Sequence, residues 1–91
     1  MYKLTLYIYP MADCGEDLTK GEALEVSIEG YNVFEIKAEI DYTILATMKA
    51  HNANDGETFV ELVIEKDGEY YDHDEATVFV DLKNNHIKYG V

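Results

Sequence analysis

The stretch from Asn32 to His51 constrains the fold most, because it is the one segment long enough to form a substantial helix. Asn32 is a favourable N-cap residue, and Glu35 lies three positions later, where its carboxylate can reach back to the backbone N–H of the cap. Apolar side chains recur at spacings of three and four residues, which places them on one helical face: Val33, Ile36, Ile40, Ile44 and Met48. This pattern predicts a helix over about residues 32–51.

The first half of the same segment also fits a strand. Apolar and polar side chains alternate from Val33 to Ile44, and several of them are β-branched. A strand from Val33 to Ile40, followed by a helix capped by Asp41, satisfies both patterns. The continuous helix is the preferred prediction, and the strand remains the alternative.

Short alternating runs on both sides of this segment are typical of strands. The Asp67–Gly68 dipeptide favours a two-residue hairpin turn. Two stretches with little periodicity, Met11–Gly21 and Asp72–Glu75, are expected to be loops. We expect strands at Tyr2–Tyr9, 23–29, Thr58–Glu65, Glu69–Tyr71, 76–82 and His86–Val91.

This order of elements predicts one α+β domain over residues 1–91. Strands before and after a single helix favour an antiparallel sheet of about five to six strands, with the helix of about 32–51 packed on one face. A chain of 91 residues has the length of one domain and buries a small core.

The charge of the chain limits its possible partners. Nineteen acidic residues oppose seven lysines, which gives a net charge of −12. Such a charge opposes direct binding to nucleic acid or to an anionic membrane, and it favours a basic protein partner. Cys14 is the one cysteine, the N-terminal residues lack the pattern of a signal peptide, and no apolar run is long enough to span a membrane. We therefore expect a cytoplasmic location.

The sequence carries no motif that indicates catalysis or a cofactor. The Asp72–Glu75 run offers carboxylate and imidazole ligands, but it lacks the spacing of a calcium loop. Carboxylates are so abundant that a pair of them does not point to acid–base chemistry. We expect neither enzymatic activity nor a bound metal or cofactor.

The arrangement of carboxylates and tyrosines instead favours protein binding. Glu57, Glu61 and Glu65 are expected on one outer face of a strand, and Tyr70 and Tyr71 are typical of interface anchors. The expected partner-binding residues are Glu57, Glu61, Glu65, Glu69, Tyr70, Tyr71, Asp72, Asp74 and Glu75.

In size and composition the whole chain resembles the small acidic inhibitors of bacteriophages, which include anti-CRISPR and anti-restriction proteins and DNA mimics. No motif matches a particular member, so no residue role is carried over. The resemblance implies a non-enzymatic inhibitor that enters the basic nucleic-acid-binding groove of a bacterial DNA- or RNA-processing protein. The alternative is a small β-rich scaffold or assembly protein that pairs through an edge strand, with a homodimer as one outcome and acidity serving only solubility.

Overall fold

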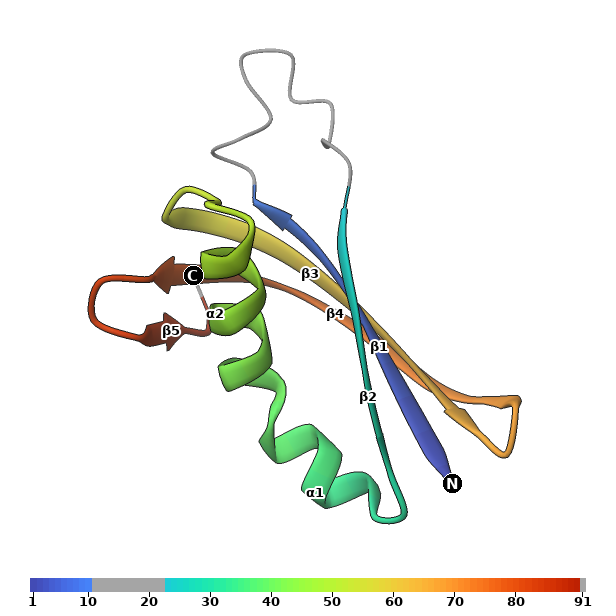
Figure 1. Ribbon diagram of the computed structural model, residues 1–91. Coiled ribbons are helices and arrows are strands. Elements are labelled where there is room, and N and C mark those ends of the chain that lie inside the picture. The colour runs from blue at the N-terminus through green and yellow to red at the C-terminus, as the bar shows by residue number, and fades with distance from the viewer. Residues whose placement is uncertain (11–22, 91) are drawn as a thin grey trace.

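The computed structural model describes residues 1–10 and 23–90, and these form an α+β fold with a five-stranded antiparallel sheet and two short helices on one face (Figure 1). The predicted fold class is confirmed. The spatial order of the strands is β2-β1-β3-β4-β5. No helix in these described ranges is long and apolar enough to cross a membrane. The elements are β1 (Tyr2–Pro10), β2 (Leu24–Gly30), α1 (Val33–Ala38), α2 (Ile40–Ala50), β3 (Gly56–Lys66), β4 (Glu69–Asp81) and β5 (His86–Lys88).

The central segment is helical, but it forms two helices instead of one. The side chain of Asn32 caps α1, because its Oδ1 accepts hydrogen bonds from the backbone N–H of Phe34 at 2.8 Å and of Glu35 at 3.3 Å. Glu39 interrupts the helix with φ −93° and ψ 0°, and α2 begins at the next residue. The strand alternative for 33–40 is therefore wrong, and the single continuous helix is corrected to two helices that meet at an angle (Figure 1).

The apolar stripe predicted for this segment does face the sheet. Ile36, Ile44 and Met48 are buried, and Val33 and Ile40 are partly buried against the core. The sheet contributes alternate side chains from β1, β3 and β4 to the same core, which follows from the two-residue repeat of a strand. These buried sheet residues include Leu4, Leu6, Ile8, Val60, Ile64, Val78 and Val80.

Gly30 allows α1 to approach the end of β2 closely. A Cβ atom built at this position would lie 2.8 Å from Cγ2 of the buried Ile36. A side chain at residue 30 would therefore force α1 away from the sheet. The close contact between Gly30 and Ile36 therefore helps to set the position of α1 on the sheet.

The largest error of the sequence prediction concerns β4. The two expected strands, Glu69–Tyr71 and 76–82, and the expected loop Asp72–Glu75 form one strand of 13 residues. Its partner β3 pairs with it through the acidic stretch, with Leu62 opposite Asp74. The backbone pairing offered by β3 overrides the low strand propensity of consecutive acidic residues.

The ends of several elements also differ from the sequence prediction. β1 continues through Pro10, β2 continues through Gly30, and β5 ends at Lys88 instead of Val91. The Asp67–Gly68 turn is confirmed, with positive φ at both residues. The expected loop at residues 11–21 lies outside the described residues.

Candidate functional site

The face of the sheet opposite the helices carries a row of glutamates on β3. Glu57, Glu61 and Glu65 alternate along the strand with Val60 and Ile64, which are buried under the helices. Because successive side chains of a strand point to opposite faces, the three glutamates lie on the face that the helices leave open. Glu75 of β4 pairs with Glu61 and joins the same face.

The edge strand β2 adds two more glutamates to this face through its pairing with β1. Tyr7 of β1 pairs with Glu25 on one side and with Glu61 on the other. Lys3 pairs in the same way with Glu29 and Glu65. Carboxylates from β2, β3 and β4 therefore lie in cross-strand rows. We call this surface the helix-free face, and its glutamates are Glu25, Glu29, Glu57, Glu61, Glu65 and Glu75.

Within the described residues, lysines are few on this face. Lys3 lies between two glutamates, and Lys88 of β5 pairs with Phe79 at the far side. Asp81 also lies at that side, where it pairs with His86 of β5. The side-chain amide of Asn84 donates a hydrogen bond of 2.8 Å to its carboxylate, and this bond lowers the pKa of Asp81. The helix-free face therefore carries a negative net charge at neutral pH.

Aromatic side chains alternate with the carboxylates on the helix-free face. The rings of Tyr9 and Phe59 lie against each other with centroids 5.9 Å apart. The hydroxyl of Tyr70 is hydrogen-bonded to Nδ1 of His73. Tyr70 is 65% exposed and Phe79 is 47% exposed, so both present ring surface to solvent. The face thus combines charge with the large apolar area that is common at protein interfaces.

The structure divides the expected partner-binding residues between two faces. Asp72 and Asp74 lie on the helix side, because they pair with Ile64 and Leu62. Glu69 lies opposite Lys66 beside the hairpin turn, and Tyr71 is the extra residue at a register shift. The ring of Tyr71 packs edge-on against Tyr2, with centroids 5.3 Å apart. The expected residues on the helix-free face are Glu57, Glu61, Glu65, Tyr70 and Glu75.

Glu25 and Glu29 are absent from the set predicted from sequence. Their alternation with apolar residues indicates that both point to one face of a strand. Their position beside Glu61 and Glu65 depends on β1 inserting between β2 and β3, which the local pattern does not reveal.

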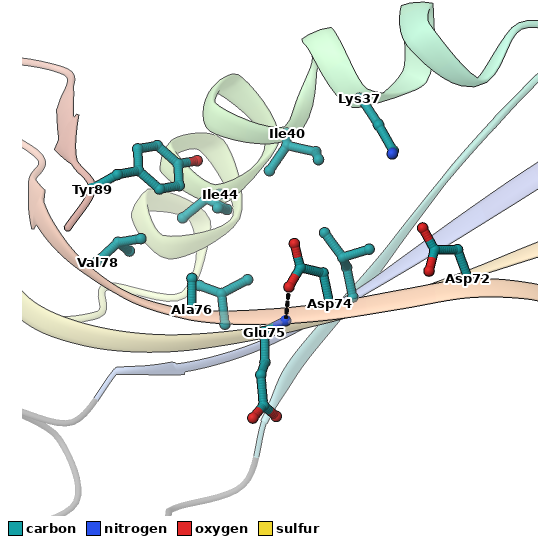
Figure 2. Close-up of a pocket in the computed structure, with 11 residues that line it drawn as sticks. Lys37, Ile40, Ile44, Asp72, Asp74, Glu75, Ala76, Val78 and Tyr89 are labelled. Carbon is teal, nitrogen blue, oxygen red and sulfur yellow. Dashed lines mark hydrogen bonds between the residues drawn. The ribbon is translucent and has the colours of Figure 1, made fainter.

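A groove lies on the other side of the sheet, between β4 and the helices. It has a volume of about 220 Å³ and an apolar floor and wall that include Leu62, Ala76, Ile40 and Ile44 (Figure 2). Figure 2 shows Asp74 pointing toward the helices, whereas Glu75 points away from them. Charged side chains stand around the groove: Lys37, Asp72 and Asp74.

Tyr89 forms the end wall of the groove. Its hydroxyl donates a hydrogen bond to the carboxylate of Asp41 on α2. Partial burial and this hydrogen-bonded carboxylate raise the pKa of Tyr89, because both disfavour the phenolate. The interaction ties the chain that follows β5 to the helices.

The described ranges contain no group of three His, Cys, Asp or Glu side chains that could hold a metal ion. The carboxylates on β3 and β4 extend along strands instead of converging on one point. Their arrangement suits contact with an extended surface.

No family model, curated protein or solved structure matches this chain.

Proposed function

We propose that this chain is a non-enzymatic acidic inhibitor that binds the basic nucleic-acid-binding groove of a bacterial DNA- or RNA-processing protein. The proposed activity is of the same kind as that of phage DNA mimics and of anti-CRISPR and anti-restriction proteins, which the chain resembles in size and composition. The observation that carries it is the concentration of glutamates from three strands on the helix-free face.

The spacing of these glutamates supports contact with a surface that recognises regularly placed phosphates. Residues four apart on a strand are separated by about 13 Å, and neighbouring strands by about 4.8 Å. Glu57, Glu61 and Glu65 repeat at the first spacing, and Glu61 and Glu75 are adjacent at the second. A groove lined by lysine and arginine would gain from releasing its counterions to such a surface, as it does with DNA.

The exposed aromatic rings support a protein partner. A face that carried only charge would bind through long-range attraction that salt screens strongly. Tyr70 and Phe79 offer apolar area within the acidic surface. Rings of this kind supply binding energy that is less sensitive to salt.

The test begins with capture and identification of a partner from a bacterial lysate, and its decisive step is competition. The captured protein should lose its own DNA or RNA as this chain is added, with a dependence on concentration that fits one shared site. Simultaneous binding of nucleic acid and this chain, with undiminished affinity, would contradict the proposal.

Replacement of glutamates on the helix-free face locates the contact. The triple substitution Glu25→Gln, Glu65→Gln and Glu75→Gln should weaken binding to the partner at least tenfold and flatten its dependence on salt. The matched control changes the same number of exposed carboxylates elsewhere: Glu35→Gln, Glu39→Gln and Asp55→Asn. Equal losses for the two triple variants would mean that only the total charge matters.

One observation favours the alternative of an assembly protein. β4 has a long outer edge that β5 pairs with only at Phe79–Asp81. Pairing of this edge with a second copy would form a homodimer. Sedimentation of the purified protein at increasing concentration distinguishes the two functions, because the inhibitor is expected to remain monomeric.

A further inference from the structure

The open edge of β4 lies directly beside the apolar groove. β3 pairs with β4 from Glu69 to Val80, with Tyr71 as the extra residue, whereas β5 covers only Phe79–Asp81 on the other side. Within the described residues, the backbone of β4 from Glu69 to Val78 therefore has no neighbouring strand at its outer edge. Such an edge presents backbone groups that an added extended segment can pair with. The N–H groups of His73 and Glu75 within this stretch already have side-chain acceptors on β4.

The groove would receive alternate side chains of a segment paired in this way. Ala76 and Val78 of β4 line the groove, and Figure 2 shows their side chains on the same side as Ile40, Ile44 and Tyr89. An added strand continues the two-residue alternation of the sheet, so every second side chain would point toward the helices. One of the side chains that point toward the helices would then contact the apolar residues that line the groove. The β4 edge and the groove together thus form a site that would bind a segment in an extended conformation.

The carboxylates beside the β4 edge favour a basic segment. Asp72 and Asp74 lie on the groove side of β4, and Glu75 lies on the opposite side. The carboxylate of Asp74 accepts a hydrogen bond of 2.8 Å from the backbone N–H of Glu75, and that of Asp72 accepts one of 2.9 Å from the backbone N–H of His73. An added strand that pairs with these N–H groups therefore displaces the two carboxylates, which can then contact its basic side chains. A basic segment would therefore meet the carboxylates of Asp72 and Asp74 on the groove side, which outnumber the ammonium group of Lys37 there, and that of Glu75 on the opposite side.

The same charges disfavour a second copy of this chain. Pairing of two copies edge to edge would bring the acidic run 72–75 of one close to that of the other. Like charges that face each other across strands are destabilising. Charged side chains on edge strands commonly prevent self-association in this way.

We infer that the β4 edge and its groove are a docking site for an extended, basic segment of the partner protein, which adds to the sheet as a strand and places an apolar side chain near Ala76. This inference rests on the proposed function only for the basic character of the partner. It names a second contact, which shares Glu75 with the helix-free face, and a backbone-directed mode of binding.

A synthetic peptide tests the inference without knowledge of the partner. The probe is a fluorescein-labelled octapeptide of alternating lysine and valine, and binding is measured by fluorescence anisotropy. We expect saturable one-to-one binding with a Kd of roughly 10–100 μM, because a flexible peptide loses conformational freedom on pairing. Absence of saturable binding up to about 1 mM would overturn the inference, since that concentration corresponds to a very weak contact.

A backbone-modified peptide separates strand pairing from charge attraction. The same sequence N-methylated at every residue keeps its side chains and charges but cannot donate backbone hydrogen bonds. Its affinity should fall at least tenfold. An affinity within about twofold of the unmodified peptide would show attraction to the acidic surface alone and would overturn the inference.

Substitutions in the protein locate the site at which the peptide binds. Ala76→Lys puts a charged side chain into the groove and should weaken binding at least tenfold relative to Ala50→Lys, which makes the same change at an exposed helical site. The pair Asp72→Asn and Asp74→Asn should weaken binding more than the pair Glu25→Gln and Glu29→Gln. Equal effects within either comparison would overturn docking at this edge.

The two proposals fail in different ways. Loss of the edge inference leaves competition with nucleic acid and its dependence on Glu25, Glu65 and Glu75 intact. Loss of the proposed function leaves peptide binding at the β4 edge intact, because that experiment contains no nucleic-acid-binding protein.

Discussion

The two halves of β4 both pair with β3, but their side chains differ in how far they are exposed to solvent. From Thr77 to Asp81 the strand alternates between exposed and buried side chains, with Val78 and Val80 almost fully buried. From Glu69 to Ala76 every side chain is exposed, although β3 pairs with both halves. The difference lies in what covers the strand, because the second half is packed under the helices and meets β5.

The buried half of β4 stabilises the fold, whereas the exposed half is available to a partner. The buried half contributes apolar area to the core, which is worth about 25 cal/mol for each Å² removed from water. The exposed half contributes little burial, so its residues are free to be acidic and aromatic. A sheet can therefore extend a surface for recognition beyond its core while backbone hydrogen bonds to β3 keep that extension ordered.

A carboxylate placed in each half of β4 should have very different effects on stability. Val80→Asp buries an unpaired carboxylate, and we expect a loss of more than about 4 kcal/mol, enough to unfold a small domain. Ala76→Asp makes the same addition on the same face of the strand, four residues earlier, where the side chain is exposed. It should change stability by no more than about 0.5 kcal/mol. Denaturant unfolding followed by circular dichroism measures both.

Similar losses for these two variants would contradict the division of β4. They would mean that the acidic half supports the fold through its side chains as well as its backbone. The peptide and partner experiments would then have to be interpreted as effects on stability.

The cap of α1 tests what holds the first helix over the sheet. Asn32→Ala removes the acceptor for two backbone N–H groups and should cost about 1 kcal/mol in unfolding free energy. Asn32→Asp keeps an acceptor and should retain most of that stability. An unchanged unfolding midpoint for Asn32→Ala would show that packing against the sheet, and not the cap, holds α1 in place.

The sequence was sufficient to predict the faces of the elements but not how far each strand extends. The apolar repeat from Val33 to Met48 identifies the residues that face the core, since the spacing of three and four depends only on helical geometry. The break at Glu39 does not appear in that repeat. The acidic run 72–75 has low strand propensity, and only its non-local pairing with β3 makes it a strand.

The candidate site was predictable from the sequence only in part. Alternation within the sequence is enough to place Glu57, Glu61 and Glu65 on one face of a strand. The contribution of Glu25 and Glu29 requires the strand order, which depends on contacts between distant parts of the chain. The groove requires both the helix break and the continuous β4, and neither is visible in the sequence pattern.

Tyr89 lies at the boundary between the covered and the open halves, and its ionisation gives the smallest expected effect. Its pKa is raised from the ordinary value of 10.0 by partial burial and by the Asp41 carboxylate. The folded state therefore holds the phenol proton more tightly than the unfolded state does. The resulting stability is fully present below pH 10 and decreases as the pH rises above it. Tyr89→Phe removes this ionisation together with the hydrogen bond to Asp41.

Denaturant midpoints at pH 8 and pH 11 provide the measurement. The midpoint of the unmodified protein should fall more between these pH values than that of Tyr89→Phe. Because the other tyrosines are present in both proteins, the difference between the two shifts isolates Tyr89. Equal shifts would mean that the phenol of Tyr89 ionises equally readily in the folded and unfolded states, so that the contact with Asp41 does not raise its pKa. Peptide binding to Tyr89→Phe at pH 8 should then match that of the unmodified protein, since the wall of the groove would not depend on the hydrogen bond.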